Sequence, residues 1–133
     1  MTHTSSKALQ RFHAGDFVGA EELHLKALRI KEKAFDGDSI EVALTRNALG
    51  EAQLRQGKLD EAQRNLEIAV RIRNSASSKN RDHVPDAAVS RENLAQVFEA
   101  KGNLAEAKRI RLKGAPDKMV CSNYNVCFIL PGG

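Results

Sequence analysis

The sequence of 133 residues contains no tryptophan, one tyrosine, three prolines and two cysteines. So few prolines leave long stretches free to form helices, because proline breaks a helix interior. No run of about 18 apolar residues is present to span a membrane. The sequence also lacks a Gly-rich phosphate loop, a His-Glu-x-x-His motif and a Gly-x-Ser-x-Gly motif. We therefore expect no membrane association, no cofactor and no catalytic residues, and hence a protein that is not an enzyme.

Charge is modest and mixed. The 21 basic and 17 acidic residues give a net charge of +4, and the two signs alternate along most of the chain, which is typical of a solvated surface. The one basic run, Lys108–Lys113, has no interleaved aromatic residues, so nucleic acid is not the expected partner. Because the N-terminus lacks the apolar segment of a secretory signal, we expect a cytoplasmic location, with the nucleus as the alternative.

Three stretches of the chain share one pattern, in which an apolar residue follows a glycine by two positions and an alanine follows it by five. They are Gly15–Ala20, Gly57–Ala62 and Gly102–Ala107, with glycines 42 and 45 residues apart. Upstream, Leu49 and Leu94 each lie eight residues before their glycine. Repetition at this period indicates a solenoid, in which each unit buries its apolar face against the next.

Apolar periodicity predicts that each unit is a pair of helices. Residues 40–54 follow helical spacing after a capping box at Asp38–Glu41, and Gly57 then breaks the helix. The same period resumes at Leu59 and includes Arg73, with a polar loop expected at 75–80. Helices are predicted at 85–101, with a proline in its first turn, and at 104–113.

Small residues allow the two helices of a pair to approach closely. We expect Gly50 or Ala95 on the first helix to face Ala62 or Ala107 on the second. The residues to which we assign repeat packing are Gly15, Ala20, Leu49, Gly50, Gly57, Ala62, Leu94, Ala95, Gly102 and Ala107.

The pattern Asn-x-Leu-Gly/Ala, followed by Gly-Lys/Asn-Leu-x-Glu-Ala, resembles the tetratricopeptide repeat (TPR) in its kinesin-light-chain-like form. Residues 81–88 resemble the Gly-x-Asp-His-Pro-x-x-Ala segment between such repeats, with a valine inserted. The resemblance implies an all-α fold, an α-α superhelix of about three helix pairs with an irregular C-terminal tail. The repeat domain would span 1–113, with repeats at about 4–38, 39–84 and 85–113, and the tail would span 114–133.

The resemblance also implies a non-catalytic adaptor or scaffold that binds a peptide or partner protein in a concave groove lined by the first helices. We expect that groove to carry Asn47, Glu51, Glu92, Asn93, Gln96 and Glu99. Asn47 and Asn93 are the leading ligand-binding candidates, because asparagine amides can bond the backbone of an extended ligand. The alternative is that both bond within the scaffold or to water. A second reading of the function is a scaffold that self-associates through exposed solenoid ends.

The tail differs in composition and holds both cysteines, Cys121 and Cys127. It resembles the start of the MYND-type zinc finger that follows the repeats in some fungal TPR proteins. The resemblance stops early, which suggests a truncated or alternatively spliced form of such a protein. Two cysteines are weak candidates for a metal site, because a structural zinc needs four ligands. A zinc-finger regulator linked to nucleic acid is the less favoured reading. We expect instead that apolar tail residues cap the last helix, namely Met119, Val120, Phe128, Ile129 and Leu130.

Overall fold

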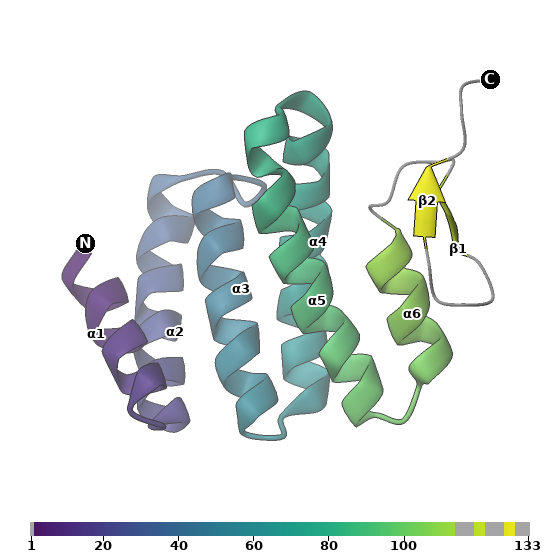
Figure 1. Cartoon of the computed structure of the whole chain (residues 1–133). Coiled ribbons are helices and arrows are strands. Elements are labelled where there is room, and N and C mark those ends of the chain that lie inside the picture. The colour runs from purple at the N-terminus through teal and green to yellow at the C-terminus, as the bar shows by residue number, and fades with distance from the viewer. Residues whose placement is uncertain (1, 114–118, 122–126, 130–133) are drawn as a thin grey trace.

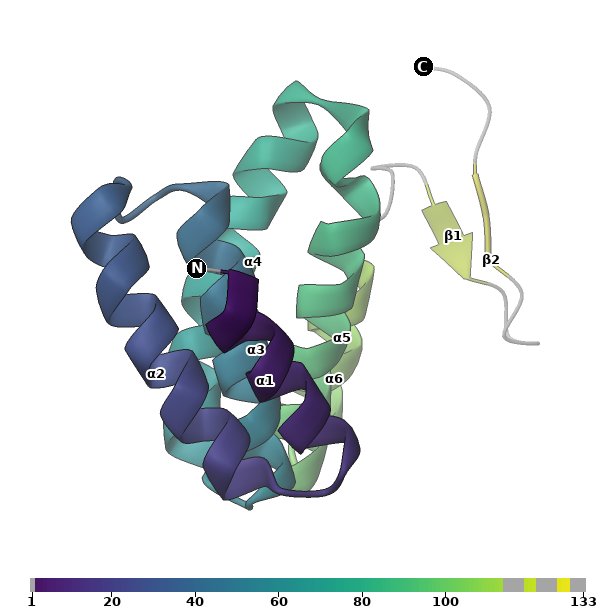
Figure 2. The same cartoon turned by 90° about the vertical axis from the view of Figure 1, so that its left-hand side faces the viewer.

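A computed structural model describes residues 2–113, 119–121 and 127–129, with side chains from residue 6 to residue 113. Three antiparallel helix pairs follow one another in chain order, from α1 to α6 (Figure 1). Viewed along the row, α1 and α2 lie nearest and the later pairs lie behind them (Figure 2). The predicted all-α solenoid of three helix pairs is confirmed. The helices are α1 (Thr2–His13), α2 (Phe17–Ala34), α3 (Ile40–Arg55), α4 (Leu59–Lys79), α5 (Val84–Ala100) and α6 (Leu104–Leu112), with a 3-10 turn at Arg81–His83.

The three repeat glycines end the first helix of each pair. Gly15, Gly57 and Gly102 have φ angles of 84°, 80° and 82°, a left-handed conformation that other residues rarely adopt. In each turn the amide after the glycine bonds a carbonyl five residues earlier, as Lys58 N–H does to Gln53 at 2.9 Å. This pattern satisfies the free carbonyls at a helix end. One turn geometry, used three times, therefore sets the angle of every pair.

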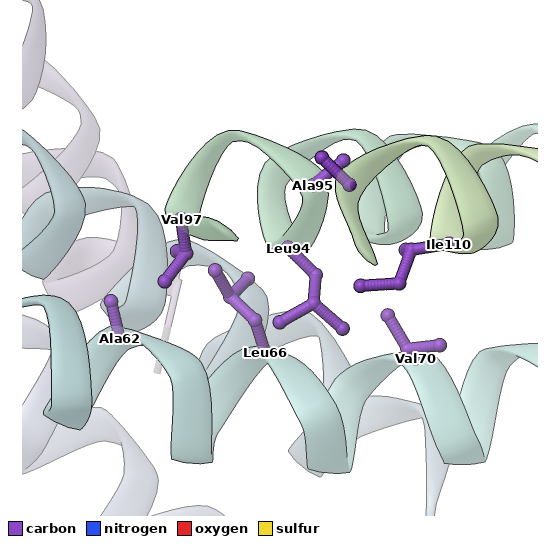
Figure 3. Close-up of a cluster of buried hydrophobic side chains, with 8 residues drawn as sticks. Ala62, Leu66, Val70, Leu94, Ala95, Val97 and Ile110 are labelled. Atoms are coloured by element: carbon purple, nitrogen blue, oxygen red, sulfur yellow. The ribbon is translucent and has the colours of Figure 1, made fainter. Parts of the chain in front are cut away.

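The core lies between successive helices and is largest around α4, α5 and α6. Leu66 is fully buried there, and Figure 3 shows it beside Val97 and Leu94. A Cβ placed on Gly50 would lie 2.6 Å from Cγ of Leu66 and 3.3 Å from the carbonyl oxygen of Ala62. Position 50 therefore has no room for a side chain, because α4 occupies the space that it would need. The cluster comprises Ala62, Leu66, Val70, Leu94, Ala95, Val97, Ala107 and Ile110.

Two predicted details of the helices are wrong. The polar loop expected from residue 75 is helical to Lys79, because the hydroxyls of Ser77 and Ser78 donate to carbonyls one turn earlier and do not open the helix. The cap of α3 is Ser39, whose Oγ accepts a hydrogen bond from the Val42 amide at 3.2 Å. Asp38, the cap expected from sequence, pairs with Arg71 at 3.0 Å.

Two short strands lie within the C-terminal tail. Strands β1 (Met119–Cys121) and β2 (Cys127–Ile129) pair in antiparallel register, with the Cα atoms of Cys121 and Cys127 opposite one another. The side chains of these six residues lie outside the described part, as does Leu130 entirely. The predicted cap on α6 and the weak metal candidates Cys121 and Cys127 therefore stay predictions.

Candidate functional site

The first helices α1, α3 and α5 each carry residues at matching repeat positions along one side, and the large apolar ones among these are exposed. On α3 these are Leu44, Ala48 and Glu51, spaced so that they lie along one side of the helix. The positions 45 residues later on α5 are Val89, Asn93 and Gln96. Leu9 of α1, at the repeat position of Glu51, is 55% exposed, and Leu44 and Val89 are each 50% exposed. We call these seven residues the inner face.

Beside the inner face, a chain of hydrogen bonds joins α3, α4 and α5. Asn47 Oδ1 accepts hydrogen bonds from Ser90 Oγ at 2.9 Å and from Asn93 Nδ2 at 3.2 Å. Ser90 Oγ in turn accepts one from Arg73 Nη1 at 2.9 Å. All four side chains are buried, with at most 8% exposed. Asn47 and Asn93 thus fix the spacing of α3 and α5, which is the scaffold role that the sequence left open.

The same pairing leaves two polar groups of the amides without partners among the described residues, the Nδ2 amine of Asn47 and the Oδ1 of Asn93. One is a donor and the other an acceptor, which is the pair of groups that an extended backbone can bond. The Asn93–Asn47 bond holds both amides in place. The network therefore fixes the orientation of one donor and one acceptor at the edge of the inner face.

The other predicted groove residues divide between two faces. Glu51 and Gln96 lie on the inner face, where both are partly exposed. Glu92 and Glu99 instead accept hydrogen bonds from Arg111 of α6, with distances from 2.7 to 3.0 Å. The hydrogen bonds from Arg111 hold the pKa of each carboxyl below its usual value, although burial opposes this. These two glutamates are therefore engaged within the molecule.

The surface that carries Arg111 belongs to α6, the last of the described helices. In the preceding repeat, the positions of Glu92, Glu99 and Arg111 hold Asn47, Leu54 and Leu66. Those three residues contact α5, since Asn47 bonds Ser90 while Leu54 and Leu66 pack in the core around Val97. Glu92, Glu99 and Arg111, which we call the end face, thus replace two leucines and an amide with an ion-paired cluster. Polar outer surfaces of this kind keep terminal repeats soluble.

Comparison with known protein families matches a Tetratricopeptide repeat model to residues 1–75. The chain belongs to the tetratricopeptide-repeat family. Repeats of this family mediate protein–protein interaction and are typically not enzymes. The comparison with curated proteins found no match. A protein partner is therefore the class of ligand that this TPR fold supports.

Two of the four basic side chains in the run Lys108–Lys113 are held in ion pairs. Arg109 bonds Glu106 and Arg111 bonds the end-face glutamates. Within residues 2–113, 119–121 and 127–129, no group of three histidines, cysteines or acids could hold a metal. None of the described helices is long and apolar enough to cross a membrane.

Sequence reasoning missed Arg73, Ser90 and the exposed apolar residues Leu44 and Val89. Arg73 gave a signal, because it continues the apolar period of α4 and so falls on the buried side of that helix. Ser90 and Thr45 share a repeat position, and both are buried. A polar residue at a buried repeat position is a signal for a hydrogen-bond network between repeats.

Proposed function

We propose that this protein is a non-catalytic adaptor that binds an extended segment of a partner protein across the inner face. The observation that carries the proposal is that Leu9, Leu44 and Val89, each at least half exposed, lie on the same side of three successive first helices. Exposed apolar side chains that gather on one surface are typical of interaction sites. The partner segment would therefore contribute apolar side chains to these positions.

The amides beside the inner face would supply the polar part of recognition. A peptide backbone lying across α3 and α5 could accept a hydrogen bond from Asn47 and donate one to Asn93, since both groups are free in the described network. Backbone hydrogen bonds give affinity with little dependence on side chains, so the apolar contacts would provide the selectivity.

Selection of binding peptides from a displayed library tests this proposal. Peptides that bind the wild-type protein should lose binding to the variant Leu44→Glu/Val89→Glu. The same peptides should still bind the variant Ile30→Glu/Leu104→Glu. This variant makes the same change at exposed apolar positions on the second helices α2 and α6. Equal binding to both variants, with both folded by circular dichroism, would rule out the inner face.

Self-association through the solenoid ends is the alternative function. The ion pairs of the end face weigh against it at the C-terminal side, because stacking would desolvate Glu92, Glu99 and Arg111. Mass measured against protein concentration separates the two functions. The mass of an adaptor should stay that of a monomer at every concentration. The mass of an end-to-end scaffold should rise with concentration.

The finer assignments rest on sequence resemblance. We infer kinesin-light-chain-like repeats from the 42-residue spacing and residues 81–88, and we propose a cytoplasmic location. The zinc-finger-like tail leads to a direct test, which is the titration of zinc against the wild type and a Cys121→Ser/Cys127→Ser variant. Equal zinc binding by the two would remove these cysteines as ligands.

A further inference from the structure

Arg91 of α5 is a buried cation without a carboxylate partner among the described residues. It is 9% exposed, and its one side-chain hydrogen bond to a described residue runs from Nη1 to Oδ1 of Asn74, an uncharged amide, at 2.6 Å. Burial lowers the pKa of Arg91, yet guanidinium remains charged in proteins. A buried charge is costly unless it is paired.

The preceding repeat contains the same arginine with its charge satisfied. Arg46, at the equivalent position of α3, donates to Glu32 Oε1 at 2.8 Å and to Asn65 Oδ1 at 2.9 Å. The residue that corresponds to Glu32 in the next repeat is Asn74, and the one that corresponds to Asn65 is Ile110. Arg91 has therefore lost a carboxylate and an amide that Arg46 possesses.

Arg91 and Ile110, the residue at the repeat position of Asn65, both line a cavity of about 250 Å³ between α4, α5 and α6. Arg91 lines it together with apolar residues, among them Leu94, Phe98 and Ile110. Arg109 and Lys113, both exposed, also line it. The two carboxylates in its wall have other partners, since Glu106 bonds Arg109 and Glu67 accepts from Gln63 at 2.8 Å.

We propose that this outer pocket binds an acidic side chain of a partner protein, whose carboxylate supplies Arg91 with a charged partner, as Glu32 does for Arg46. The apolar lining favours an acidic residue that stands next to a large apolar one. The volume suits one or two side chains and is smaller than the pockets that hold drug-sized ligands. The pocket does not share a residue with the inner face, so it would be a second point of contact.

Alignment of the two repeats suggests one substitution for the test and a matched control beside it. Asn74→Glu gives Arg91 the internal carboxylate that Arg46 has, whereas Ser75→Glu adds the same charge at the neighbouring exposed position. The probes are acetyl-Leu-Glu-amide and its neutral analogue acetyl-Leu-Gln-amide. NMR follows the side-chain Nε–H signal of Arg91 and the backbone amides of Leu94 and Phe98.

We expect acetyl-Leu-Glu-amide to shift these signals in the wild type and in Ser75→Glu. The neutral analogue should not shift them. Asn74→Glu should weaken the binding of acetyl-Leu-Glu-amide roughly tenfold or more, because the introduced carboxylate takes the charge-assisted hydrogen bond of Arg91 from the probe. Asn74→Glu should also melt at a higher temperature than Ser75→Glu. No shift up to about 50 mM probe, equal shifts with both probes, or equal affinity in Asn74→Glu would each overturn the proposal.

Discussion

Nη1 of Arg73 lies 2.9 Å from Oγ of Ser90, and this hydroxyl is the side-chain partner of a guanidinium that is only 4% exposed. Its other hydrogen bond goes to the backbone carbonyl of Asp86 at 3.2 Å, while its Nε has no partner among the described residues. Burial lowers the pKa of Arg73, although Asp86 opposes the shift. The stability of the second and third repeats therefore depends on a small hydroxyl.

Ser90→Ala should lower the free energy of unfolding by about 1 to 3 kcal/mol, because it leaves a buried donor of Arg73 and a lone pair of Asn47 unsatisfied. Urea denaturation followed by circular dichroism measures the change. Ser75→Ala, an exposed serine on α4, is the matched control and should have little effect. A Ser90→Ala variant as stable as the control would show that the Arg73–Ser90 bond contributes nothing.

Ala62→Leu should lower the free energy of unfolding by about 1 to 3 kcal/mol through overpacking. Ala62 is fully buried, and a Cβ placed on Gly50 would lie only 3.3 Å from the carbonyl oxygen of Ala62. Ala105→Leu, on the exposed side of α6, is the control, because it adds the same isopropyl group where it extends into solvent. If the two variants have the same melting temperature, the close contact between α3 and α4 is not a constraint.

Acid should destabilise the protein in part through Glu21, which is 6% exposed. Burial by itself raises the pKa of Glu21, but hydrogen bonds from Lys58, Gln53 and Gln56 outweigh it and hold the pKa below the usual 4.5. The unfolded chain then binds the proton more readily than the folded one. The contribution of Glu21 is thus present above about pH 4.5 and lost as the pH falls through the lower folded value.

Glu21→Gln tests that contribution. The difference in unfolding free energy between the wild type and the variant should be largest near neutral pH and shrink below about pH 4.5. Denaturant titrations across this range measure it, with the exposed Glu22→Gln as the control. A difference that stays constant with pH would mean that the charge of Glu21 does not stabilise the fold.

The end face should determine whether the solenoid stacks on itself. The triple change Glu92→Asn, Glu99→Leu and Arg111→Leu gives this surface the residues that meet the next helix in the preceding repeat. We expect mass to rise with concentration in this variant and not in the wild type, as apolar solenoid ends associate. Arg109→Leu on the same helix is the control, and association there as strong as in the triple variant would contradict a specific role for the end face.

The sequence predicted the architecture because the repeat is encoded locally. Gly15, Gly57 and Gly102 are the positions that need a positive φ, and the apolar period locates each buried side. It did not predict the pairing of Glu92 and Glu99 with Arg111, because this depends on how α6 packs on α5. The end of α4 was missed because serines usually indicate a loop, whereas here their hydroxyls bond the helix backbone.

The difference between the hydrogen-bond partners of Arg46 and those of Arg91 could be recognised in the sequence only after the fold was known. Their equivalence follows from the repeat spacing, but Glu32 and Asn74 belong to different repeats from the arginines that they bond. Contacts of this kind cross from one repeat to the next. Aligning repeats therefore identifies equivalent residues and not their partners.

The second helices also differ in length, since α2 has 18 residues and α4 has 21. The added part of α4 carries its junction with α5 above the other helix ends (Figure 1). Asn80, Arg81 and Asp82 are exposed there, and neither the inner face nor the outer pocket includes them. A tether attached at Arg81 would hold the molecule in a known orientation and leave both surfaces accessible to a partner in solution.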